Sequence, residues 1–345
     1  MTHMAPTTES AQRNDLMPQT PGVAGRCGYL SLLLLALLLP FSWGCNKSAP
    51  QSNGRLRIAV IPKSMSHVFW TSVEAGAKKA GEELDVEIIW KAPIKEDDRA
   101  QQIELVQQFV ADEVSGIVLA PLDSQALVGP VKASAQAGVP VVIIDSGLNA
   151  QQGTDYISFV GTNNELGGTL GGEKLAEILG GKGDVVLLRY AEGSASTTDR
   201  ERGFTNAIAQ HPEIHIISDN QYAGTTSGEA QDRALNMMDA LKAANGIFCP
   251  NESSTDGMLQ ALRKEGVIGN VKFVGFDASP PLVEALSKGE IDGLVVQNPY
   301  MMGYLGVKAM VDHLRGTTVE PVIDTGVNVV TRDIMNDPEI RPLLP

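Results

Sequence analysis

From Arg55 onward, short apolar runs alternate with segments of helical length, and this alternation constrains the fold more than any other feature. The apolar runs are mostly β-branched and continuous, which is typical of parallel strands that are buried on both faces. Repeated strand–helix order predicts a doubly wound α/β architecture. The runs expected to form strands are Leu56–Ile61, Val86–Trp90, Gly116–Ala120, Pro140–Ile144, Ile157–Val160, Val185–Arg189, Ile214–Ser218, Gly246–Cys249, Lys272–Phe276 and Gly293–Val296. The helical segments expected between them are 67–84, 97–113, 124–137, 163–179, 198–210, 227–243, 253–265, 279–288 and 299–314.

Ten strands in about 290 residues are too many for one small sheet. The pattern therefore predicts two similar parallel-sheet lobes of five or six strands each, with a break near Gly161–Asn164. Ligands of open α/β sheets bind beyond the carboxyl ends of the strands. Two lobes can place those ends opposite each other, so we expect a ligand cleft between them.

The segment Leu30–Phe41 is the most apolar stretch of the chain, and it is shorter than the roughly 20 residues of a membrane-spanning helix. Its length, with Arg26 before it and Cys45 close behind, is typical of a secretory signal core. A cysteine at this point resembles the lipobox of bacterial lipoproteins, in which the thiol is acylated. We therefore expect residues 1–45 to be a lipoprotein-type signal peptide, Cys45 to carry the lipid, and residues 46–54 to be a tether. A signal peptide cut elsewhere and an uncleaved anchor are the alternatives.

The charge balance disfavours two kinds of partner. The chain has 27 Lys and Arg against 41 Asp and Glu, a formal net charge of −14. Such a chain is a poor match to nucleic-acid phosphates and to an anionic membrane surface. We expect no nucleic-acid partner, and contact with the membrane only through the lipid on Cys45. Beyond residue 45, Cys249 is the only cysteine, so no disulfide is expected within the exported body.

Polar and aromatic side chains follow several of the expected strands. Carboxylates, amides and a guanidinium can satisfy hydroxyl groups, which both donate and accept hydrogen bonds. Flat aromatic rings can cover the C–H faces of a sugar ring. The set therefore predicts a site for a neutral, polyhydroxylated small molecule. Its members are His67, Phe69, Trp70, Asp145, Arg200, Asn251, Asp277 and Gln297.

Each of these positions also has a simpler structural interpretation. An Asp or Asn after a strand is often a turn residue or a helix N-cap. Arg200 could pair with a carboxylate beside it, and Phe69 and Trp70 could be core residues. The simpler interpretation is less convincing for the whole set than for any single residue.

In this order the residues resemble the periplasmic sugar-binding proteins of the ribose/galactose type, the solute receptors of ABC transporters. The resemblance extends from Arg55 to about Val330. It implies two lobes joined by three crossovers, near 161–163, 297–298 and 325–327. The lobes would comprise residues 55–161 plus 298–326 and residues 162–297 plus 327–345. The segments that carry the resemblance are Ile58–Lys63, His67–Trp70, Ala120–Ser124, Val142–Asp145, Asn164–Gly168, Thr198–Arg200, Gly203–Phe204, Asn251, Val274–Asp277 and Gln297.

The resemblance also implies a function. The eight site residues would line the ligand site, with Phe69 and Trp70 on either side of the sugar ring and the polar side chains bonded to its hydroxyls. The chain would be a monomeric receptor of the periplasm or cell envelope that captures a sugar or polyol by hinge closure and delivers it to an ABC permease. No cofactor, metal or catalytic residue is implied. Ribose receptors have Arg at the position of Ser146 and Asn at the positions of Ala120 and His67, so a ligand other than ribose is expected.

Three other classes of protein share parts of this pattern. A transcription regulator of the same fold needs a basic DNA-binding headpiece, and here that place holds the signal core and tether. An enzyme is not favoured, because the sequence has no Gly-x-Ser-x-Gly, P-loop or His-Glu-x-x-His motif. The glycine-rich segment Gly167–Gly172 instead predicts close helix packing. A sensory receptor for a small polar ligand is the alternative to transport, since the two differ only in the surface that meets the partner.

Overall fold

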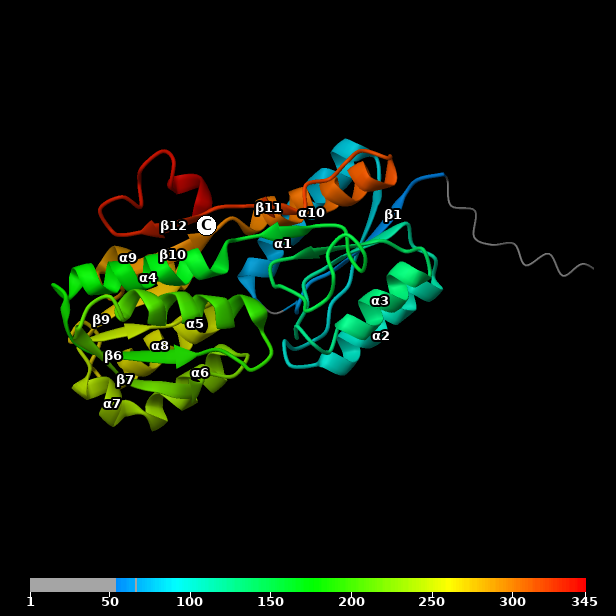
Figure 1. Cartoon of the computed structure of the whole chain (residues 1–345). Helices are drawn as coiled ribbons and strands as arrows, with labels where there is room; N and C mark the ends of the chain where they lie inside the picture. Colours follow the sequence, from blue (N-terminus) through cyan, green and yellow to red (C-terminus); the bar gives the residue numbers. More distant parts are fainter. Residues whose placement is uncertain (1–53, 66) are drawn as a thin grey trace, which may run out of the picture. The chain divides into compact units, whose positions relative to one another are not determined.

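The computed structural model describes residues 54–65 and 67–345, and the expected signal peptide with Cys45 lies outside these residues (Figure 1). The described residues contain two six-stranded sheets, each covered by helices on both faces. The expected doubly wound α/β architecture with two lobes is therefore confirmed. None of the described helices is long and apolar enough to cross a membrane.

The first sheet has the strand order β11-β5-β4-β3-β1-β2, and all its strands are parallel. Its strands are β1 (Arg57–Ile61), β2 (Glu87–Trp90), β3 (Gly116–Leu119), β4 (Val141–Ile144), β5 (Phe159–Gly161) and β11 (Val322–Asp324). One face is covered by α1 (Val68–Leu84) and α10 (Pro299–Leu314), and the other by α2 (Arg99–Ala111) and α3 (Val128–Gln136).

The second sheet has the order β12-β10-β9-β8-β6-β7, in which β12 is antiparallel to β10 and the other pairs are parallel. Its strands are β6 (Lys182–Arg189), β7 (Glu213–Tyr222), β8 (Gly246–Phe248), β9 (Lys272–Phe276), β10 (Gly293–Gln297) and β12 (Val327–Val330). One face is covered by α4 (Asn164–Ile178) and α5 (Ala195–Ile208). The other is covered by α6 (Ser227–Asn236), α7 (Met238–Ala243), α8 (Glu252–Lys264) and α9 (Pro280–Lys288).

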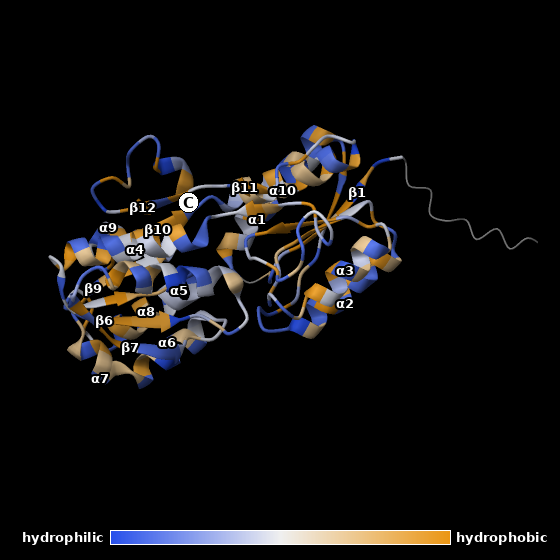
Figure 2. Ribbon diagram, viewed as in Figure 1, coloured by the Kyte–Doolittle hydropathy of each residue, from blue (hydrophilic) through white to orange (hydrophobic). Residues whose placement is uncertain are grey.

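The two lobes repeat one plan, because corresponding strands stand in the same order in both sheets. The chain passes from one sheet to the other three times: after β5, after β10 and between β11 and β12. Central strands are buried on both faces, and Figure 2 shows them as the most hydrophobic elements of each lobe.

Three details differ from the sequence-based expectations. The edge strands β11 and β12 were not expected, because they are short and partly exposed and so lack a continuous apolar run. The single helix expected over 227–243 is two helices that meet at Met237. Helix α3 begins later than expected, because the Asp123 carboxylate accepts the backbone N–H groups of Gln125 and Ala126 and holds a turn there.

Glycines bring two pairs of helices into close contact. A Cβ atom built on Gly168 of α4 would lie 1.8 Å from the carbonyl oxygen of Arg200 in α5. In the first lobe, a Cβ on Gly76 of α1 would lie 1.9 Å from the carbonyl oxygen of Tyr300 in α10. The close packing expected around Gly168 is confirmed, and it fixes the backbone that carries Arg200.

Candidate functional site

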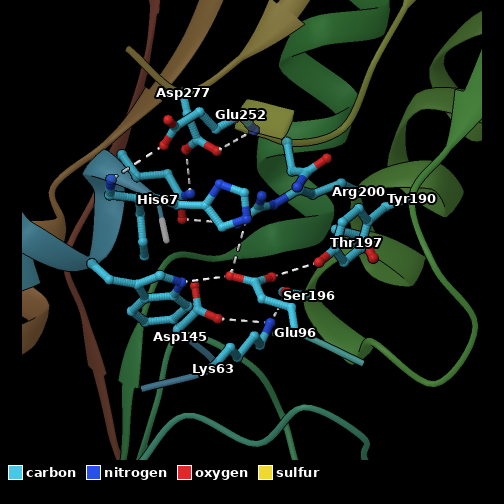
Figure 3. A pocket seen from close by; sticks show the side chains of 14 residues that line it. Lys63, His67, Glu96, Asp145, Tyr190, Ser196, Thr197, Arg200, Glu252 and Asp277 are labelled. Carbon is cyan, nitrogen blue, oxygen red and sulfur yellow. Dashed lines mark hydrogen bonds and ion pairs between the residues drawn. The ribbon is translucent and has the colours of Figure 1, made fainter. Parts of the chain in front are cut away.

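A cavity lies at the carboxyl ends of strands from both sheets (Figure 3). The structure brings all eight residues selected from the sequence to this cavity. They are His67, Phe69, Trp70, Asp145, Arg200, Asn251, Asp277 and Gln297. Six further lining residues were not selected: Lys63, Glu96, Tyr190, Ser196, Thr197 and Glu252.

Asp145 and Asp277 both lie at left-handed backbone positions directly after a strand. Their φ angles are 62° and 72°, a conformation that Asp tolerates better than most residues. The turn moves each carboxylate out of the sheet and into the cavity, although both residues are more than nine-tenths buried. A turn role and a site role therefore coincide at these two residues.

Arg200 is the centre of the polar network in the second lobe. It is 2% exposed, and its guanidinium stacks on the ring of Phe276, 3.9 Å from the ring centroid. It donates to Asn164 Oδ1 at 2.8 Å, to the Pro250 carbonyl at 3.0 Å and to Gln297 Oε1 at 2.9 Å. Three of its five N–H groups are thereby used, and the guanidinium is fixed in one plane. The expected alternative, a pair with an adjacent carboxylate, is not what the structure shows.

Asp277 and Glu252 form an acidic pair on one side of the cavity. Asp277 accepts hydrogen bonds from Gln297 Nε2 at 2.7 Å and from the backbone N–H of Glu252 at 2.9 Å. Burial raises the pKa of Asp277, and the charge of Arg200 opposes this. Burial and then the neighbouring Asp277 raise the pKa of Glu252 to about 7. A carboxyl group with this pKa can donate a hydrogen bond when protonated and accept one when ionised.

The opposite side of the cavity is built around Glu96. Its Oε1 accepts the indole N–H of Trp70 at 2.6 Å, and its Oε2 accepts the hydroxyl of Tyr190 at 2.5 Å. His67 Nε2 is buried without a hydrogen-bond partner and lies 3.6 Å from Glu96 Oε1. In Figure 3 the His67 ring stands between Glu96 and the Glu252–Asp277 pair. This imidazole is therefore placed to bond with a molecule in the cavity.

The expected aromatic sandwich is wrong. The rings of Phe69 and Trp70 touch each other edge to face, with centroids 4.9 Å apart and planes at 88°. A sugar ring does not fit between them. Adjacent residues at the start of one helix cannot face each other across a ligand, so at most one ring can stack on it. Trp70 also belongs to the core of the first lobe, so the alternative interpretation of Trp70 as a core residue applies as well.

Asn251 has two roles in the structure. Its side chain caps α8 by accepting the backbone N–H of Ser254 at 3.3 Å, and its amide donates to Ser253 Oγ at 3.1 Å. It also lines the cavity. The interpretation as an N-cap therefore holds, and the cap fixes the position of the amide at the cavity wall.

Direct hydrogen bonds join the two lobes around the cavity. The Lys63 ammonium donates to Ser196 Oγ at 3.2 Å, and the Phe69 N–H donates to Glu252 Oε2 at 3.2 Å. The Tyr190–Glu96 bond crosses in the same way. At the edge of the cleft, Arg99 donates to the Glu192 carbonyl at 2.8 Å. The walls of the cavity are thus held together by polar groups of both lobes.

For some of the lining residues that were not selected, the sequence contains a pattern that could have identified them. Tyr190 directly follows the run that forms β6, and Glu252 follows Asn251, so the rule that found Asp145 could have found both. Lys63 lies two residues after β1. Glu96 lies in the loop between β2 and α2, and no local pattern marks its direction. In the described part of the chain, no group of three or more His, Cys, Asp or Glu side chains is arranged to hold a metal ion.

Two doubly wound lobes with a polar cavity between the carboxyl ends of their strands define a two-lobed α/β binding protein. The chain belongs to the periplasmic binding protein domain family, whose model matches residues 58–318. This finding confirms the resemblance seen in the sequence.

Named relatives and solved structures agree with this assignment. The chain is 29% identical over 269 residues to the D-allose-binding periplasmic protein of Escherichia coli, covering 76% of this chain and 86% of the relative. It is 30% identical over 285 residues to the D-ribose/D-allose-binding protein of Pseudomonas aeruginosa, covering 80% and 88%. A carbohydrate transporter solute-binding protein from Agrobacterium radiobacter, solved with D-arabinose, superposes with a TM-score of 0.81 at 32% identity, covering 85% of this chain and all of that one. A solute-binding protein from Agrobacterium vitis with bound D-fucose gives 0.81 at 33% identity, covering 84% and all of that chain.

Proposed function

We propose that this chain is the extracytoplasmic receptor of an ABC-type importer and that it captures a sugar or a sugar-like polyol. The observation that carries the proposal is the cavity itself, in which carboxylates, amides, a guanidinium and an ammonium from both lobes converge at the strand ends. Hydroxyl groups can use acceptors and donors at once, so a polyol satisfies such a wall better than an apolar or singly charged ligand. Relatives named for ribose and fructose import and for D-allose binding support this choice.

The charge of the cavity narrows the ligand class. Four carboxyl groups face two basic side chains, Lys63 and Arg200, and both basic groups already donate to protein acceptors. A sugar acid or sugar phosphate would therefore meet net repulsion. We infer a neutral pentose, hexose or polyol.

Capture requires that the lobes move apart and together. The three connections between the sheets are the hinge we propose, and the hydrogen bonds that join the lobes stabilise the closed form. A ligand favours closure only through contacts that it makes better in the closed form. Residues on both walls of the cavity meet this requirement.

Family membership implies a periplasmic location. We further propose that the chain is tethered to the membrane by a lipid on Cys45, acts as a monomer, and releases its ligand unchanged to the permease. A Cys45→Ser variant should move from the membrane fraction to the soluble fraction of the cell envelope. Retention of that variant in the membrane would contradict the lipid anchor.

The test of the function is a thermal-shift screen of the purified protein against pentoses, hexoses, sugar alcohols, sugar acids and amino acids. A ligand at about 1,000 times its Kd adds roughly 4 kcal/mol to the free energy of unfolding, which is readily detected. A selective response to one neutral sugar or polyol is expected. Mass spectrometry of the denatured protein checks for a ligand that copurifies. A response to amino acids alone, or to no compound when no ligand copurifies, would contradict the proposal.

A further inference from the structure

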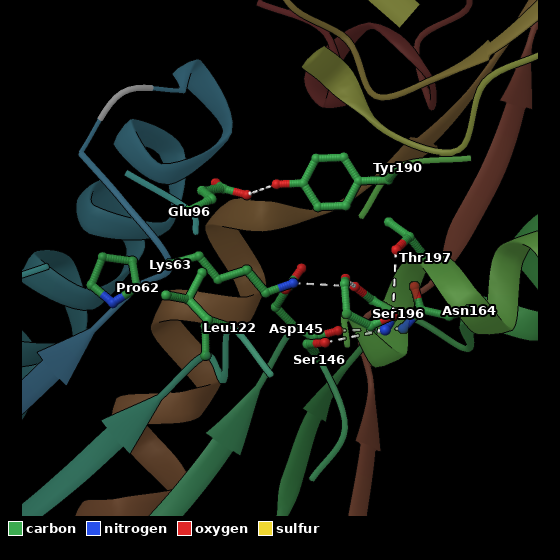
Figure 4. Close-up of polar contacts among 12 residues, drawn as sticks. Pro62, Lys63, Glu96, Leu122, Asp145, Ser146, Asn164, Tyr190, Ser196 and Thr197 are labelled. Carbon is green, nitrogen blue, oxygen red and sulfur yellow. Dashed lines mark hydrogen bonds and ion pairs between the residues drawn. The ribbon is translucent and has the colours of Figure 1, made fainter. Parts of the chain in front are cut away.

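Lys63 has an unusual position for a lysine. It follows β1 by two residues and is 4% exposed. Its ammonium lies 2.9 Å from Asp145 Oδ2 and donates to Ser196 Oγ at 3.2 Å. Figure 4 shows the side chain reaching across the cavity wall to both partners. A buried ammonium is unfavourable unless a counter-charge and hydrogen-bond acceptors replace water, and Asp145 and Ser196 supply them.

The two partners of Lys63 belong to different lobes. Asp145 follows β4 in the first sheet, whereas Ser196 lies in the first turn of α5 beside the second sheet. A second bond crosses at the same place, because the backbone N–H of Ser196 donates to Ser146 Oγ at 3.1 Å. We call Lys63, Asp145, Ser146 and Ser196 the Lys63 bridge. The bridge is complete only when the lobes are together.

Some hydrogen-bonding groups of Lys63 and Asp145 are not used by the protein and face the cavity. The ammonium has three N–H donors, one of which bonds to Ser196 Oγ, while its contact with Asp145 is an ion pair that leaves Asp145 Oδ2 without a hydrogen-bond partner among the described residues. The Asp145 carboxylate has a second oxygen, Oδ1, for which no protein donor is recorded among the described residues. One donor of Lys63 and one acceptor oxygen of Asp145 therefore stand side by side. A hydroxyl group can use both at once.

We propose that Lys63 is a positioning residue for ligand recognition: its ammonium fixes the Asp145 carboxylate as an acceptor for a ligand hydroxyl and, through Ser196, makes this arrangement depend on closure of the lobes. The inference rests on the proposed function, since it needs a hydroxylated ligand in this cavity. The inference adds Lys63 to the proposed ligand site as a residue that positions another side chain. Affinity should depend on Lys63 mainly through Asp145.

Among the described residues, Lys63 is the direct counter-charge of Asp145, and the Arg200 charge acts on it without an ion pair. Within the described residues, Lys63 is the one cationic side chain that forms an ion pair with Asp145. The other charged or titratable side chains that line the cavity are His67, Glu96, Tyr190, Arg200, Glu252 and Asp277. Arg200 is bonded to Asn164, Pro250 and Gln297 instead. Without Lys63, the buried Asp145 carboxylate would lack a direct counter-charge and would be unfavourable in that place.

The test compares Lys63→Met, Asp145→Asn and the double variant by calorimetry, with the sugar or polyol that gives the strongest response in the screen. Methionine keeps the length and apolar character of the lysine stem but removes the ammonium. Each single variant is expected to raise Kd about 10- to 100-fold, because a charge-assisted hydrogen bond is lost. If Lys63 acts through Asp145, the double variant should be no weaker than the weaker single variant. Lys132→Met is the matched control, since Lys132 is about half exposed and away from the cavity.

A conservative variant separates positioning from a merely structural role. Lys63→Arg keeps a cation beside Asp145, so its Kd should lie closer to that of the wild type than the Kd of Lys63→Met does. In the Asp145→Asn background the two substitutions at Lys63 should give the same Kd, because the carboxylate on which they act is absent.

Ser196→Ala tests the part of the bridge in the second lobe. It leaves the Lys63–Asp145 pair in place, and we expect ligand to dissociate about three- to tenfold faster. This variant also keeps the proposal open to refutation if circular dichroism shows that Lys63→Met does not fold. Any of three results would overturn the inference. The Kd of Lys63→Met could lie within about twofold of the wild-type Kd, the losses in the double variant could be additive, or the dissociation rate of Ser196→Ala could be unchanged. If the wild-type protein binds no sugar or polyol, the proposed function fails instead.

Discussion

Asp145 and Asp277 occupy equivalent positions in the two lobes. Asp145 follows β4 and Asp277 follows β9, and these strands have the same place in the order of their sheets. Each residue has a positive φ, and each donates its N–H to a carbonyl of the adjacent strand, at Val160 O (3.1 Å) and Val295 O (2.8 Å). The two carboxylates interact with different groups. Asp145 forms an ion pair with Lys63, whereas Asp277 accepts hydrogen bonds from the Gln297 amide and the Glu252 backbone N–H. The same left-handed turn after a strand therefore places two carboxylates, with different protein partners, at one ligand site.

Asp277→Asn should weaken ligand binding about 10- to 100-fold, because one charged acceptor oxygen becomes a donor. Asparagine tolerates the left-handed backbone at this position, whereas alanine would add strain. We therefore expect the variant to fold. The measurement is titration calorimetry with the ligand found by the screen.

Asp85→Asn is the matched control for Asp277→Asn. Asp85 also has a positive φ, of 54°, but its side chain is 85% exposed and does not line the cavity. Its substitution should leave Kd unchanged. An unchanged Kd in Asp277→Asn would remove Asp277 from the ligand site.

Glu252→Gln should stabilise the folded protein at alkaline pH. The pKa of Glu252 is raised from 4.5 to about 7 by burial and by Asp277, so the folded chain binds this proton more tightly than the unfolded chain does. The contribution of Glu252 to stability is therefore most favourable below pH 4.5 and decreases as pH rises to about 7. Glutamine does not titrate and can still accept the Phe69 N–H. The advantage of the variant should grow from little at pH 5 to at most about 3 kcal/mol at pH 8.

Thermal and urea unfolding between pH 5 and pH 8 check this expectation. The exposed Glu104→Gln variant serves as the control for the loss of one negative charge. An advantage of Glu252→Gln that does not change with pH would contradict the raised pKa. The same result would show that the acidic pair is accessible to water in the unliganded protein.

The fold could be predicted from the sequence because its main signal is local. Ten apolar runs mark strands, and the central ones are buried on both faces, which leaves a direct record in composition. Strands β11 and β12 leave no such record, because they form by pairing with the exposed edges of sheets that other segments build. Their existence depends on contacts between distant parts of the chain.

The residues directly after strands were the easiest part of the site to predict. Asp145 and Asp277 follow apolar runs directly, so the topology alone brings them to the cleft. Glu96 enters the cavity from a loop between β2 and α2, and its partners Trp70 and Tyr190 are distant in sequence. The direction of such a side chain is set by tertiary packing. For the same reason, the sequence could not show that Phe69 and Trp70 pack edge to face.

Gly168→Ala should destabilise the second lobe and weaken ligand binding together. The added methyl group would lie 1.8 Å from the Arg200 carbonyl oxygen, so α4 and α5 must separate. Overpacking of this kind costs about 1–3 kcal/mol, and it shifts the backbone that carries the Arg200 guanidinium. Gly129→Ala is the control, because a methyl group there meets nothing within 4 Å and replaces a helical glycine. It should leave Kd unchanged and stabilise the protein by up to about 1 kcal/mol; equal unfolding temperatures for the two variants would contradict close packing of α4 on α5.

Tyr190→Phe should accelerate ligand release without changing the rate of capture. The Tyr190 hydroxyl donates to Glu96 across the cleft, and this bond exists only when the lobes are together. Burial and the adjacent Glu96 raise the pKa of Tyr190 well above its usual value near 10, so the phenol remains a donor at physiological pH. Phenylalanine fills the same space, which leaves the loss of one hydrogen bond to a charged acceptor as the main change. We expect the dissociation rate to rise about tenfold.

Stopped-flow measurement of ligand association and dissociation distinguishes this role from a general loss of affinity. Tyr300→Phe is the control, since that side chain is 38% exposed and does not line the cavity. Glu96 keeps its bond from Trp70 in the Tyr190→Phe variant, so the first-lobe wall should stay in place. If dissociation is as slow as in the wild type, the Tyr190–Glu96 bond does not stabilise the closed form. If association slows instead, Tyr190 acts on entry of the ligand, and the contacts that keep the lobes closed must be sought at Lys63 and Arg99.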